Sequence, residues 1–473
     1  MKKIEIIQGG MGVAVSDWKL AQSVSKEGQL GVISGTGIHL IMIARLMEGD
    51  IGGHVQRALN HFPFHDPVQW ILKEYYRENP QEGATYKRPP MWNFKPSKKL
   101  NELTVVANFV ETFLAKEGHK NPVGINLLEK VQMPTMASLY GAMLAGIDYV
   151  IMGAGIPTQI PGILDRLVKH EKVSYRMNVV GATADDNFFM DFDPKEVFSN
   201  ALDKVQSLLR PNFLPIISSV VLAKTLLRRS TGKVNGFVVE GHTAGGHNAP
   251  PRGKMQLDEN GEPIFGEKDT PKLEKIKELG LPFWLAGEYD SPEKLKEAQE
   301  AGAEGVQLGT AFAYCDESGM ADNEKRKVIQ KVVEESAVVL TDPRVSPTGY
   351  PFKVVQLENT MSEPEVYKAR PRLCDLGLLR DAYKRDDGSL GYRCEAEPED
   401  QYLKKGGKAE NLEGRGCLCN NLCASAGYPQ HRKDGYVEQP LVSSGKGLPS
   451  IVKFFKEGKR SYSAKDVLSY MLG

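Results

Sequence analysis

Cysteine is scarce in this chain, with six residues in 473. Six are too few for the disulfide scaffold that stabilises many small secreted domains. The sequence also lacks a run of about 18 apolar residues, so we expect no membrane-spanning helix. Its start, "MKKIEIIQGG", has no apolar segment of the length found in a signal peptide. We therefore expect a protein of the reducing cytoplasm.

An excess of charge of either sign is absent too. Lysine and arginine number 60, and so do aspartate and glutamate. A balanced chain offers no general attraction to a nucleic acid or to an anionic membrane. The expected partner is a small molecule, and the sequence leaves the oligomeric state open. Apolar residues make up 41% of the chain, which is ample for a large buried core.

Two common nucleotide-binding motifs are missing. "GGMGVAV" and "GTGIHL" each begin like a dinucleotide fingerprint, but Val15 and Leu40 stand where that fingerprint needs a small residue. No Gly-Lys-Ser/Thr sequence of a phosphate-binding P-loop occurs. A Rossmann dehydrogenase and a nucleoside triphosphatase are therefore disfavoured.

Apolar runs alternate with amphipathic helical segments along much of the chain. A helix over 17–27, for example, has Leu20, Ala21 and Val24 on one face, and Gly28 stops it. Another begins at Ser291, with Pro292 at its first position. The predicted strands begin near residues 4, 30, 123, 149, 214, 236, 282 and 305. Eight such units favour a TIM (β/α)8 barrel, although a doubly wound open sheet has the same local pattern.

Three segments interrupt or follow this series of strand–helix units. We place the barrel in residues 1–340, with insertions at about 51–120 and 172–212, and a C-terminal extension at 341–473 that packs on the barrel. The second insertion begins with a predicted hairpin over 172–192. The first contains Phe62, Phe64, Trp70, Trp92 and Phe94. These aromatic side chains either cover the substrate as a lid or, as we favour, anchor a long loop to the body.

Glycine residues recur after the predicted strands one, four, six, seven and eight. In parallel β/α folds, ligands bind at the carboxyl ends of the strands, and barrels often bind phosphate after strands seven and eight. Glycine lets backbone N–H groups approach a ligand closely. Each cluster alone is better explained by a tight turn, because turns commonly use glycine. Together they favour a ligand that bears phosphate.

The sequence "EGHTAGGH" (240–247) adds two histidines after the sixth strand. Neither an HExxH motif nor a cysteine pair accompanies them, so zinc is unsupported. A histidine at this rim is either a general acid or base or an ordinary loop residue, and sequence alone leaves both open.

Four motifs nevertheless resemble one family closely. "IIQGGMG", "VGINLL", "FVVEGHTAGGH" and "AGAEGVQLGTAF" are similar, in this order, to the nitronate monooxygenase (2-nitropropane dioxygenase) family and to the related FMN-dependent enoyl-ACP reductase II. "SSVVLAKTL" (218–226) resembles the reductase. The resemblance covers roughly residues 1–50 and 120–320. "GYRC", "GGK" and "GRGCLCN" resemble the tail of longer proteins of the same kind.

The resemblance implies a barrel that holds FMN without a covalent bond, and it makes His247 the catalytic histidine. The positions that match the family's cofactor-binding residues are Gly10, Met11, Asn126, Gly245, Gly246, Gly287, Gly309 and Thr310. One position departs from the pattern, because Glu288 stands where many members have a second glycine.

The expected activity is therefore that of a flavoprotein oxidoreductase, a nitronate monooxygenase that converts alkyl nitronates and O2 into carbonyl compounds and nitrite. One alternative is an FMN-dependent enoyl-ACP reductase that takes electrons from NAD(P)H. Another is a flavin-binding protein without catalytic activity.

The tail holds four of the six cysteines close together in sequence. Cys394, Cys417, Cys419 and Cys423 are enough thiols for zinc or an iron–sulfur cluster. Their spacing lacks the usual C-x2-C turn. We therefore predict no metal and ordinary packed thiols.

Overall fold

In the computed structural model, which describes residues 3–199, 202 and 205–473, eight parallel strands form one sheet. They are β1 (Ile6–Gln8), β2 (Gly31–Ser34), β3 (Val123–Leu128), β4 (Tyr149–Gly153), β8 (Asn212–Ile217), β9 (Phe237–Glu240), β10 (Phe283–Ala286) and β11 (Gly305–Leu308). β1 pairs with β11, and the N–H of Gln8 donates to the carbonyl oxygen of Leu30 at 2.9 Å. This bond joins β1 to the start of β2 and closes the ring. The fold is therefore the TIM barrel that the sequence predicted, rather than an open sheet.

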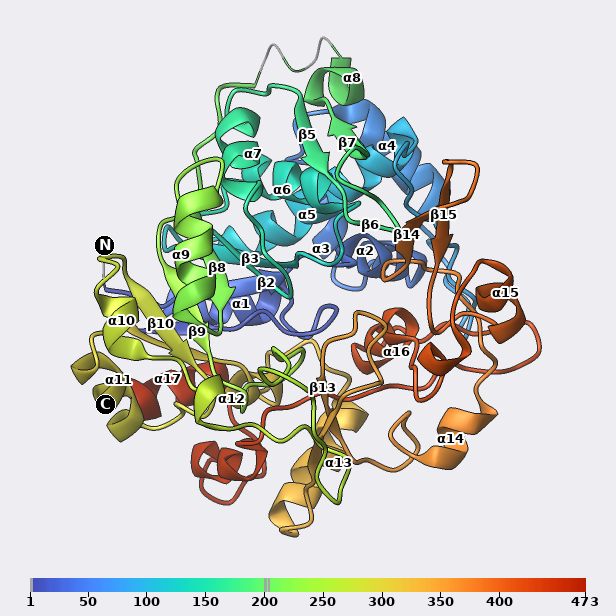
Figure 1. Ribbon diagram of the computed structural model, residues 1–473. Helices are drawn as coiled ribbons and strands as arrows, with labels where there is room; N and C mark the ends of the chain where they lie inside the picture. Colours follow the sequence, from blue (N-terminus) through green and yellow to red (C-terminus); the bar gives the residue numbers. More distant parts are fainter. Residues whose placement is uncertain (1–2, 200–201, 203–204) are drawn as a thin grey trace.

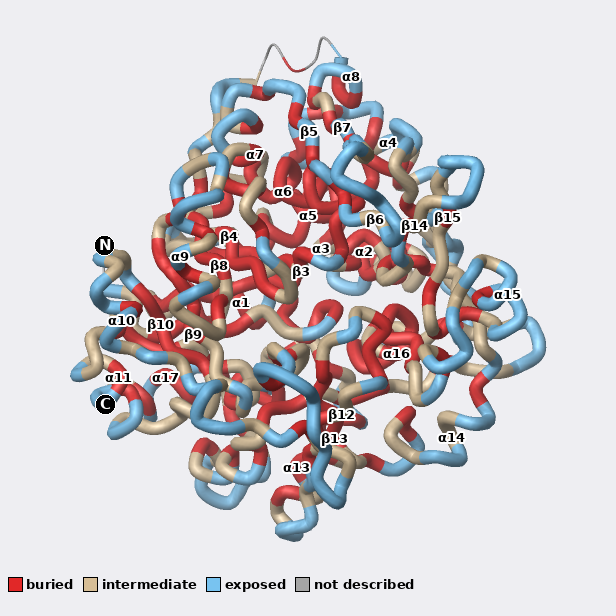
Figure 2. The backbone as a smooth tube through the Cα atoms, viewed as in Figure 1, coloured by how far each residue is buried: buried red, intermediate tan, exposed pale blue. Residues whose placement is uncertain are grey.

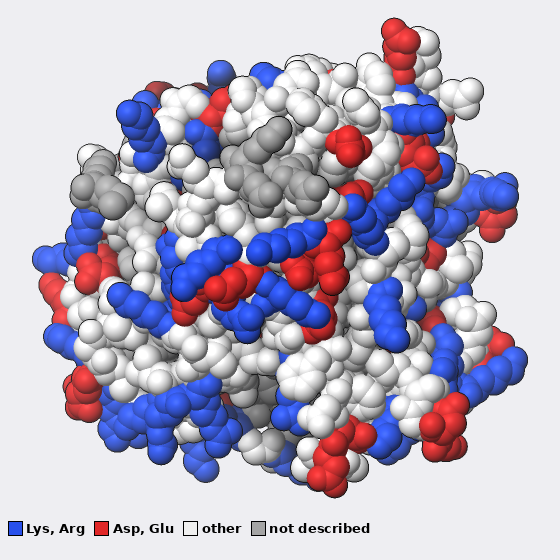
Figure 3. Space-filling model, turned by 90° about the horizontal axis from the view of Figure 1, so that it is seen from above, with Lys and Arg blue, Asp and Glu red and all other residues white. Residues whose placement is uncertain are grey.

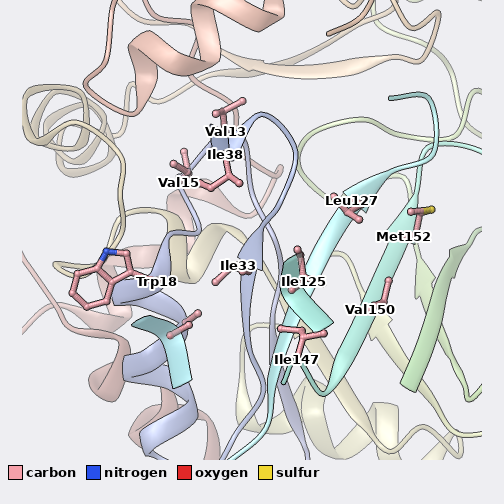
Figure 4. Close-up of a cluster of buried hydrophobic side chains, with 14 of the residues drawn as sticks. Val13, Val15, Trp18, Ile33, Ile38, Ile125, Leu127, Ile147, Val150 and Met152 are labelled. Carbon is pink, nitrogen blue, oxygen red and sulfur yellow. The ribbon is translucent and has the colours of Figure 1, made fainter. Parts of the chain in front are cut away.

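Along the strands, side chains alternate between two buried apolar clusters. Ile7, Val32 and Ile151 belong to one buried cluster with Trp284, which fills the inside of the barrel. Their chain neighbours belong to a second cluster between strands and helices. Figure 4 shows part of this outer cluster, with Ile33, Ile125 and Val150 side by side. Strands with apolar residues on both faces are typical of a parallel sheet covered by helices.

Helices lie outside the ring after most strands (Figure 1). They are α1 (Trp18–Lys26), α2 (Ile38–Met47), α6 (Thr135–Leu144), α7 (Ile160–Leu167), α9 (Val220–Arg229), α10 (Leu273–Lys277), α11 (Pro292–Glu300), α12 (Thr310–Ala313) and α13 (Asp322–Val333). Side-chain caps begin several of them, as predicted. Asp17 accepts hydrogen bonds from the N–H groups of Lys19 and Leu20, and Ser291 accepts one from Lys294.

The first inserted segment contains α3 (His54–Leu59), α4 (His65–Tyr75) and α5 (Lys98–Lys116). α5 packs against α1 and α6 and is buried over most of its length. Phe62 stacks edge-on against Phe109 of α5 with ring centroids 5.0 Å apart, and Trp92 is buried. The five aromatic side chains act as anchors, because none of them lines the main cavity described below.

The second inserted segment begins with the predicted hairpin, in which β5 (Val173–Arg176) pairs antiparallel with β7 (Phe189–Phe192). β6 (Val179–Val180) and α8 (Pro194–Phe198) complete its described part. β6 pairs with β14 of the C-terminal tail. The predicted insertion 172–212 includes residues 200, 201, 203 and 204, which lie outside the described residues.

The C-terminal tail, residues 341–473, runs across one side of the barrel (Figure 1). Its elements, with the strand that leads into it, are β12 (Val339–Asp342), β13 (Phe352–Val355), α14 (Pro364–Ala369), β14 (Asp381–Lys384), β15 (Leu390–Arg393), α15 (Glu399–Lys404), α16 (Leu418–Ser425), α17 (Ala464–Leu472) and the 3-10 helix η4 (Leu448–Phe454). α17 packs against α1 and α11 on the barrel. Figure 2 shows that α16 is buried, facing the barrel.

Positive and negative side chains are mixed on the surface, in keeping with their equal numbers in the sequence. On the face shown in Figure 3, cationic and anionic side chains lie next to one another. One ion pair within the tail is almost completely buried. Nε of Arg370 lies 2.8 Å from Oε2 of Glu438, and both side chains are nearly inaccessible to solvent. Across the described residues, no helix is long and apolar enough to cross a membrane.

Candidate active site

The carboxyl ends of the barrel strands surround a cavity of about 240 Å³. Every one of the eight strands contributes residues to its wall, either from its last turn or from the loop that follows. This is the end at which (β/α)8 barrels bind their ligands. The position of the cavity therefore agrees with the one expected from the glycine clusters.

All nine predicted site residues line this one cavity. They are Gly10, Met11, Asn126, Gly245, Gly246, His247, Gly287, Gly309 and Thr310. Gly10 and Asn126 are in direct contact, because a Cβ atom on Gly10 would lie 2.3 Å from the Cβ of Asn126. Only glycine fits at position 10, which ties the loop after β1 to the end of β3. The structure thus brings the predicted residues together, while their individual roles stay predictions.

His247 packs against β13 of the tail. The N–H of Lys353 donates to the carbonyl oxygen of Gly246 at 3.0 Å, and the imidazole meets the ring of Phe352 edge-on with centroids 4.7 Å apart. Nε2 of His247 lies 2.7 Å from the hydroxyl oxygen of Ser346. Burial lowers the pKa of His247 to about 4. The side chain is therefore neutral at pH 7 and has a free lone pair on one ring nitrogen.

His242 occupies a different environment, although it is only five residues away. Its side chain is exposed, stacks on the ring of Phe265 at 4.6 Å, and does not line the cavity. Of the two histidines in "EGHTAGGH", only His247 faces the site.

Backbone amides collect at the end of the cavity formed by the loops after β9, β10 and β11. In the described part of the chain, the N–H groups of Gly245, Gly287 and Gly309 have no backbone acceptor. Gly287 has φ = 109°, a value that favours glycine. Unpaired N–H groups that converge in this way form a site for an anion. Glu288 follows with φ = 56°, so a side chain stands in a conformation that glycine adopts more readily.

The tail completes this end of the cavity. The N–H of Gly445 donates to Oγ1 of Thr310 at 2.9 Å, and the N–H of Gly246 donates to Oγ of Ser443 at 3.2 Å. The sequence offered no signal for these contacts, because the partners lie 135 and 197 residues apart.

The tail also supplies an apolar wall. Leu378 and Leu379 precede β14, Leu418 and Leu422 belong to α16, and Leu441 follows later in the chain. The cavity is thus lined by apolar side chains of the tail as well as by the glycine loops of the barrel.

Two half-buried polar residues of the cavity were not predicted from the sequence. Glu240 ends β9, and burial raises the pKa of its carboxyl group to about 8, despite the nearby charge of Lys353. Gln307 lies in β11, one residue before its end, and its Oε1 atom is buried without a hydrogen-bond partner. A glutamate at the end of the apolar run "FVVE" is the signal that could have identified the first of them.

Lys353 binds the histidine loop, and its charge also acts on Glu240. Its side chain is 1% exposed, and Nζ donates to the carbonyl oxygen of His242, Oδ1 of Asn248 and Oγ1 of Thr341. Burial lowers the pKa of Lys353 to about 8.

No metal centre is evident among the described residues, where no group of three or more His, Cys, Asp or Glu side chains could hold a metal ion. The cysteines of the tail are buried, except for the half-buried Cys374.

The protein belongs to the class of (β/α)8 barrels, and its cavity is lined by glycine loops and one histidine. Within this chain, residues 172–358 match the family model described as nitronate monooxygenase. The matched segment contains β5 to β13, and with them His247 and Ser346. The match agrees with the resemblance seen in the motifs, and it covers this segment alone.

Three solved structures are similar to the chain. FabK from Thermotoga maritima is 15% identical, with a TM-score of 0.47, and the match covers 99% of this chain and 92% of FabK. Nitroalkane oxidase from Streptomyces ansochromogenes is 14% identical, with a TM-score of 0.46, covering 99% and 94%. The enoyl reductase domain of MlnA from Bacillus amyloliquefaciens is 10% identical, with a TM-score of 0.47, covering 98% and 92%. Among curated proteins, no sequence matches this chain.

Proposed function

We propose that this protein is an FMN-dependent oxidoreductase that oxidises alkyl nitronates with O2 to carbonyl compounds and nitrite. The observation that carries the proposal is the meeting of His247 with three glycine loops in one cavity of a barrel, within a segment that matches the nitronate monooxygenase family.

The residues present fit FMN. The unpaired N–H groups of Gly245, Gly287 and Gly309 suit its phosphate, and the buried, unpartnered Oε1 of Gln307 suits a donor group of a flavin ring. Asn126 and Met11 line the same cavity and would lie beside that ring. When bound, FMN supplies the redox chemistry, while the chain provides orientation and electrostatics.

His247 provides a base for substrates that still carry their α-proton. Nε2 is paired with Oγ of Ser346, and Nδ1 has no hydrogen-bond partner in the described part of the chain. We infer that Nε2 carries the proton in this pair, which leaves the lone pair on Nδ1. A pKa of about 4 keeps the imidazole neutral, so it accepts the proton of a neutral nitroalkane at Nδ1. A nitronate is already an anion and does not need this step.

The apolar wall gives one specific reason for a second candidate. Leu378, Leu418, Leu422 and Leu441 offer more apolar surface than a small nitronate covers, and an acyl chain would fit against them. The second candidate is therefore the enoyl-ACP reductase, with NAD(P)H as the electron donor.

One experiment separates these functions. The purified protein is loaded with FMN, and the flavin absorption band is followed after anaerobic mixing with propionate 3-nitronate, NADH or NADPH. Bleaching by the nitronate alone is the expected result, followed by nitrite release when O2 is admitted. Rapid bleaching by a nicotinamide would instead identify the reductase, and a bound flavin that no donor reduces would identify a protein without this catalysis. Protein that binds no FMN would overturn the proposal.

A further inference from the structure

Four cysteine side chains surround a second, much smaller cavity of about 10 Å³ in the tail. Cys374 lies in the loop between α14 and β14, Cys394 follows β15, and Cys417 and Cys419 lie at the start of α16. Three segments thus deliver thiols to one point, an arrangement that sequence spacing did not reveal. None of these residues belongs to the site described above except Cys419, which lines both cavities.

The four thiols are not equivalent. Cys374 is half-buried, whereas the other three are buried. The thiol of Cys394 donates a hydrogen bond to Cys374, which lowers the pKa of Cys374 even against its own burial, and Arg380 adds to the effect. The same contact, together with burial, raises the pKa of Cys394. Cys374 is therefore the more accessible and the more readily ionised thiol of the two, and Cys394 lines the same small cavity beside it.

We propose that Cys374 and Cys394 form a redox pair that hydroperoxides oxidise to a disulfide. The thiolate of Cys374 attacks one oxygen of the hydroperoxide, the O–O bond breaks, and an alcohol or water leaves with a sulfenic acid formed on Cys374. The sulfur of Cys394 then attacks this sulfenic sulfur, the S–O bond breaks, and water leaves as the S–S bond forms. Two electrons pass from the two thiols to the hydroperoxide, and the two thiol protons leave in the products.

The other two thiols of the cavity are less suited to either step. Cys417 accepts a hydrogen bond from Nδ2 of Asn420 at 3.5 Å, and burial raises its pKa. Burial also raises the pKa of Cys419 well above its ordinary value. Buried neutral thiols react slowly with peroxides and are poor metal ligands, because the thiolate is the reactive form. The pair in contact is therefore favoured over a four-thiol metal site.

The pair lies directly behind the wall of the main cavity. Leu379 and Leu418 line both cavities, as Cys419 does. Asp375, next to Cys374, accepts hydrogen bonds from Arg432 at 2.5 Å and from Asn420 at 2.8 Å, so this loop is tied to α16. A disulfide from Cys374 to the end of β15 would fix the loop that carries Leu378 and Leu379. The redox state of the pair would thus alter the apolar wall of the site. The proposal does not depend on which substrate the main cavity takes.

The test uses the full-length protein and graded hydrogen peroxide. Free thiols are blocked with light iodoacetamide, disulfides are reduced and labelled with heavy iodoacetamide, and peptides are identified by mass spectrometry. We expect two thiols per chain to be lost together, with heavy label on Cys374 and Cys394, and full recovery after dithiothreitol. In the reduced protein, Cys374 should alkylate about tenfold faster than the buried cysteines. Peroxide that oxidises other cysteines first, or that leaves all six thiols free, would overturn the proposal.

Variants locate the two steps. Cys394→Ser should stop at a sulfenic acid on Cys374 that dimedone traps, whereas Cys374→Ser should lose both the sulfenic acid and the disulfide. Cys423→Ser is the matched control, since this buried thiol lies in α16 but outside the small cavity, and it should oxidise like the wild type. A disulfide that persists in Cys374→Ser would contradict the pair. The pair would also be contradicted if the protein contained about one zinc ion per chain and removal of the zinc made all four thiols reactive. The wild-type peptide map decides the question even if one variant fails to fold.

Discussion

Nε2 of His247 and Oγ of Ser346 lie 2.7 Å apart, although 99 residues separate them in sequence. Ser346 is fully buried, and its hydroxyl oxygen also lies 2.8 Å from Oγ1 of Thr348. The loop between β12 and β13 therefore holds the orientation of the imidazole, as a partner of one ring nitrogen does for many functional histidines.

Ser346→Ala should slow the oxidation of a neutral nitroalkane more than that of its nitronate. Without the hydroxyl group, either ring nitrogen of His247 can carry the proton, so the fraction with a free lone pair on Nδ1 falls. We expect kcat for the nitroalkane to fall about tenfold, a part of the 10²- to 10⁴-fold that general base catalysis typically contributes. Steady-state nitrite assays with the two substrates measure this ratio. Ser336→Ala, an exposed serine, is the control, and an equal loss for both substrates would rule out a role in proton transfer.

The depressed pKa of His247 predicts a specific dependence of stability on pH. Its native pKa of about 4 lies below the ordinary value of 6.5, so between these pH values the unfolded state binds the proton more readily. The free energy of unfolding should therefore fall as the pH is lowered from 6.5 towards 4. Urea denaturation at pH 7 and pH 5 should show a smaller fall in His247→Asn than in the wild type. His65→Asn should behave like the wild type, because this histidine is exposed in the native protein.

The raised pKa of Glu240 predicts that stability and substrate binding both change above pH 7. With a pKa of about 8, its carboxyl group is neutral at pH 7 and ionises as the pH rises through 8. Its contribution to stability is complete below about pH 4.5 and is lost as the pH rises through 8. An ionised carboxylate in the cavity also repels an anionic nitronate. The Michaelis constant for the nitronate should therefore rise between pH 7 and pH 9 in the wild type.

Glu240→Gln copies the neutral carboxyl group and should remove most of that rise. Glu300→Gln, on the exposed side of α11, should retain it. Michaelis constants measured at pH 7 and pH 9 make the comparison, and an identical rise in Glu240→Gln would show that another group titrates.

Gly287→Ala should weaken FMN binding through the backbone. An alanine at φ = 109° is strained, and its Cβ would lie 2.8 Å from Oγ1 of Thr243. Strained backbone of this kind costs about 1 to 3 kcal/mol, so the loop should shift and its N–H should leave the anion site. Gly280→Ala is the matched control, with φ = 72° but open space around the new Cβ. Flavin fluorescence titration should show weaker FMN binding for Gly287→Ala only, and equal affinities in the two variants would argue against a role of this loop.

The barrel could be predicted from the sequence because its signals are local. Each of the eight strands is a short apolar run bounded by turn residues, and Asp17 and Ser291 mark helix starts directly. The placement of His247 in the cavity followed from its position after the sixth strand. Ser346, Ser443 and Gly445 could not be found in this way. They reach the site from a tail without clear periodicity, and their hydrogen bonds join residues about a hundred or more positions apart.

Thr310 tests whether the tail is part of the cofactor site. Thr310→Val keeps the shape of the side chain but leaves the N–H of Gly445 without its acceptor, and a buried unpaired donor costs about 1 to 3 kcal/mol. The segment around Gly445 should then detach from the loop after β11, so both FMN affinity and the unfolding temperature should fall. Thr310→Ser retains the hydroxyl group and should restore both. Fluorescence titration and thermal unfolding of the cofactor-free proteins separate the two effects. A fall in FMN affinity with no change in unfolding temperature would mean that Thr310 binds the cofactor without holding the tail.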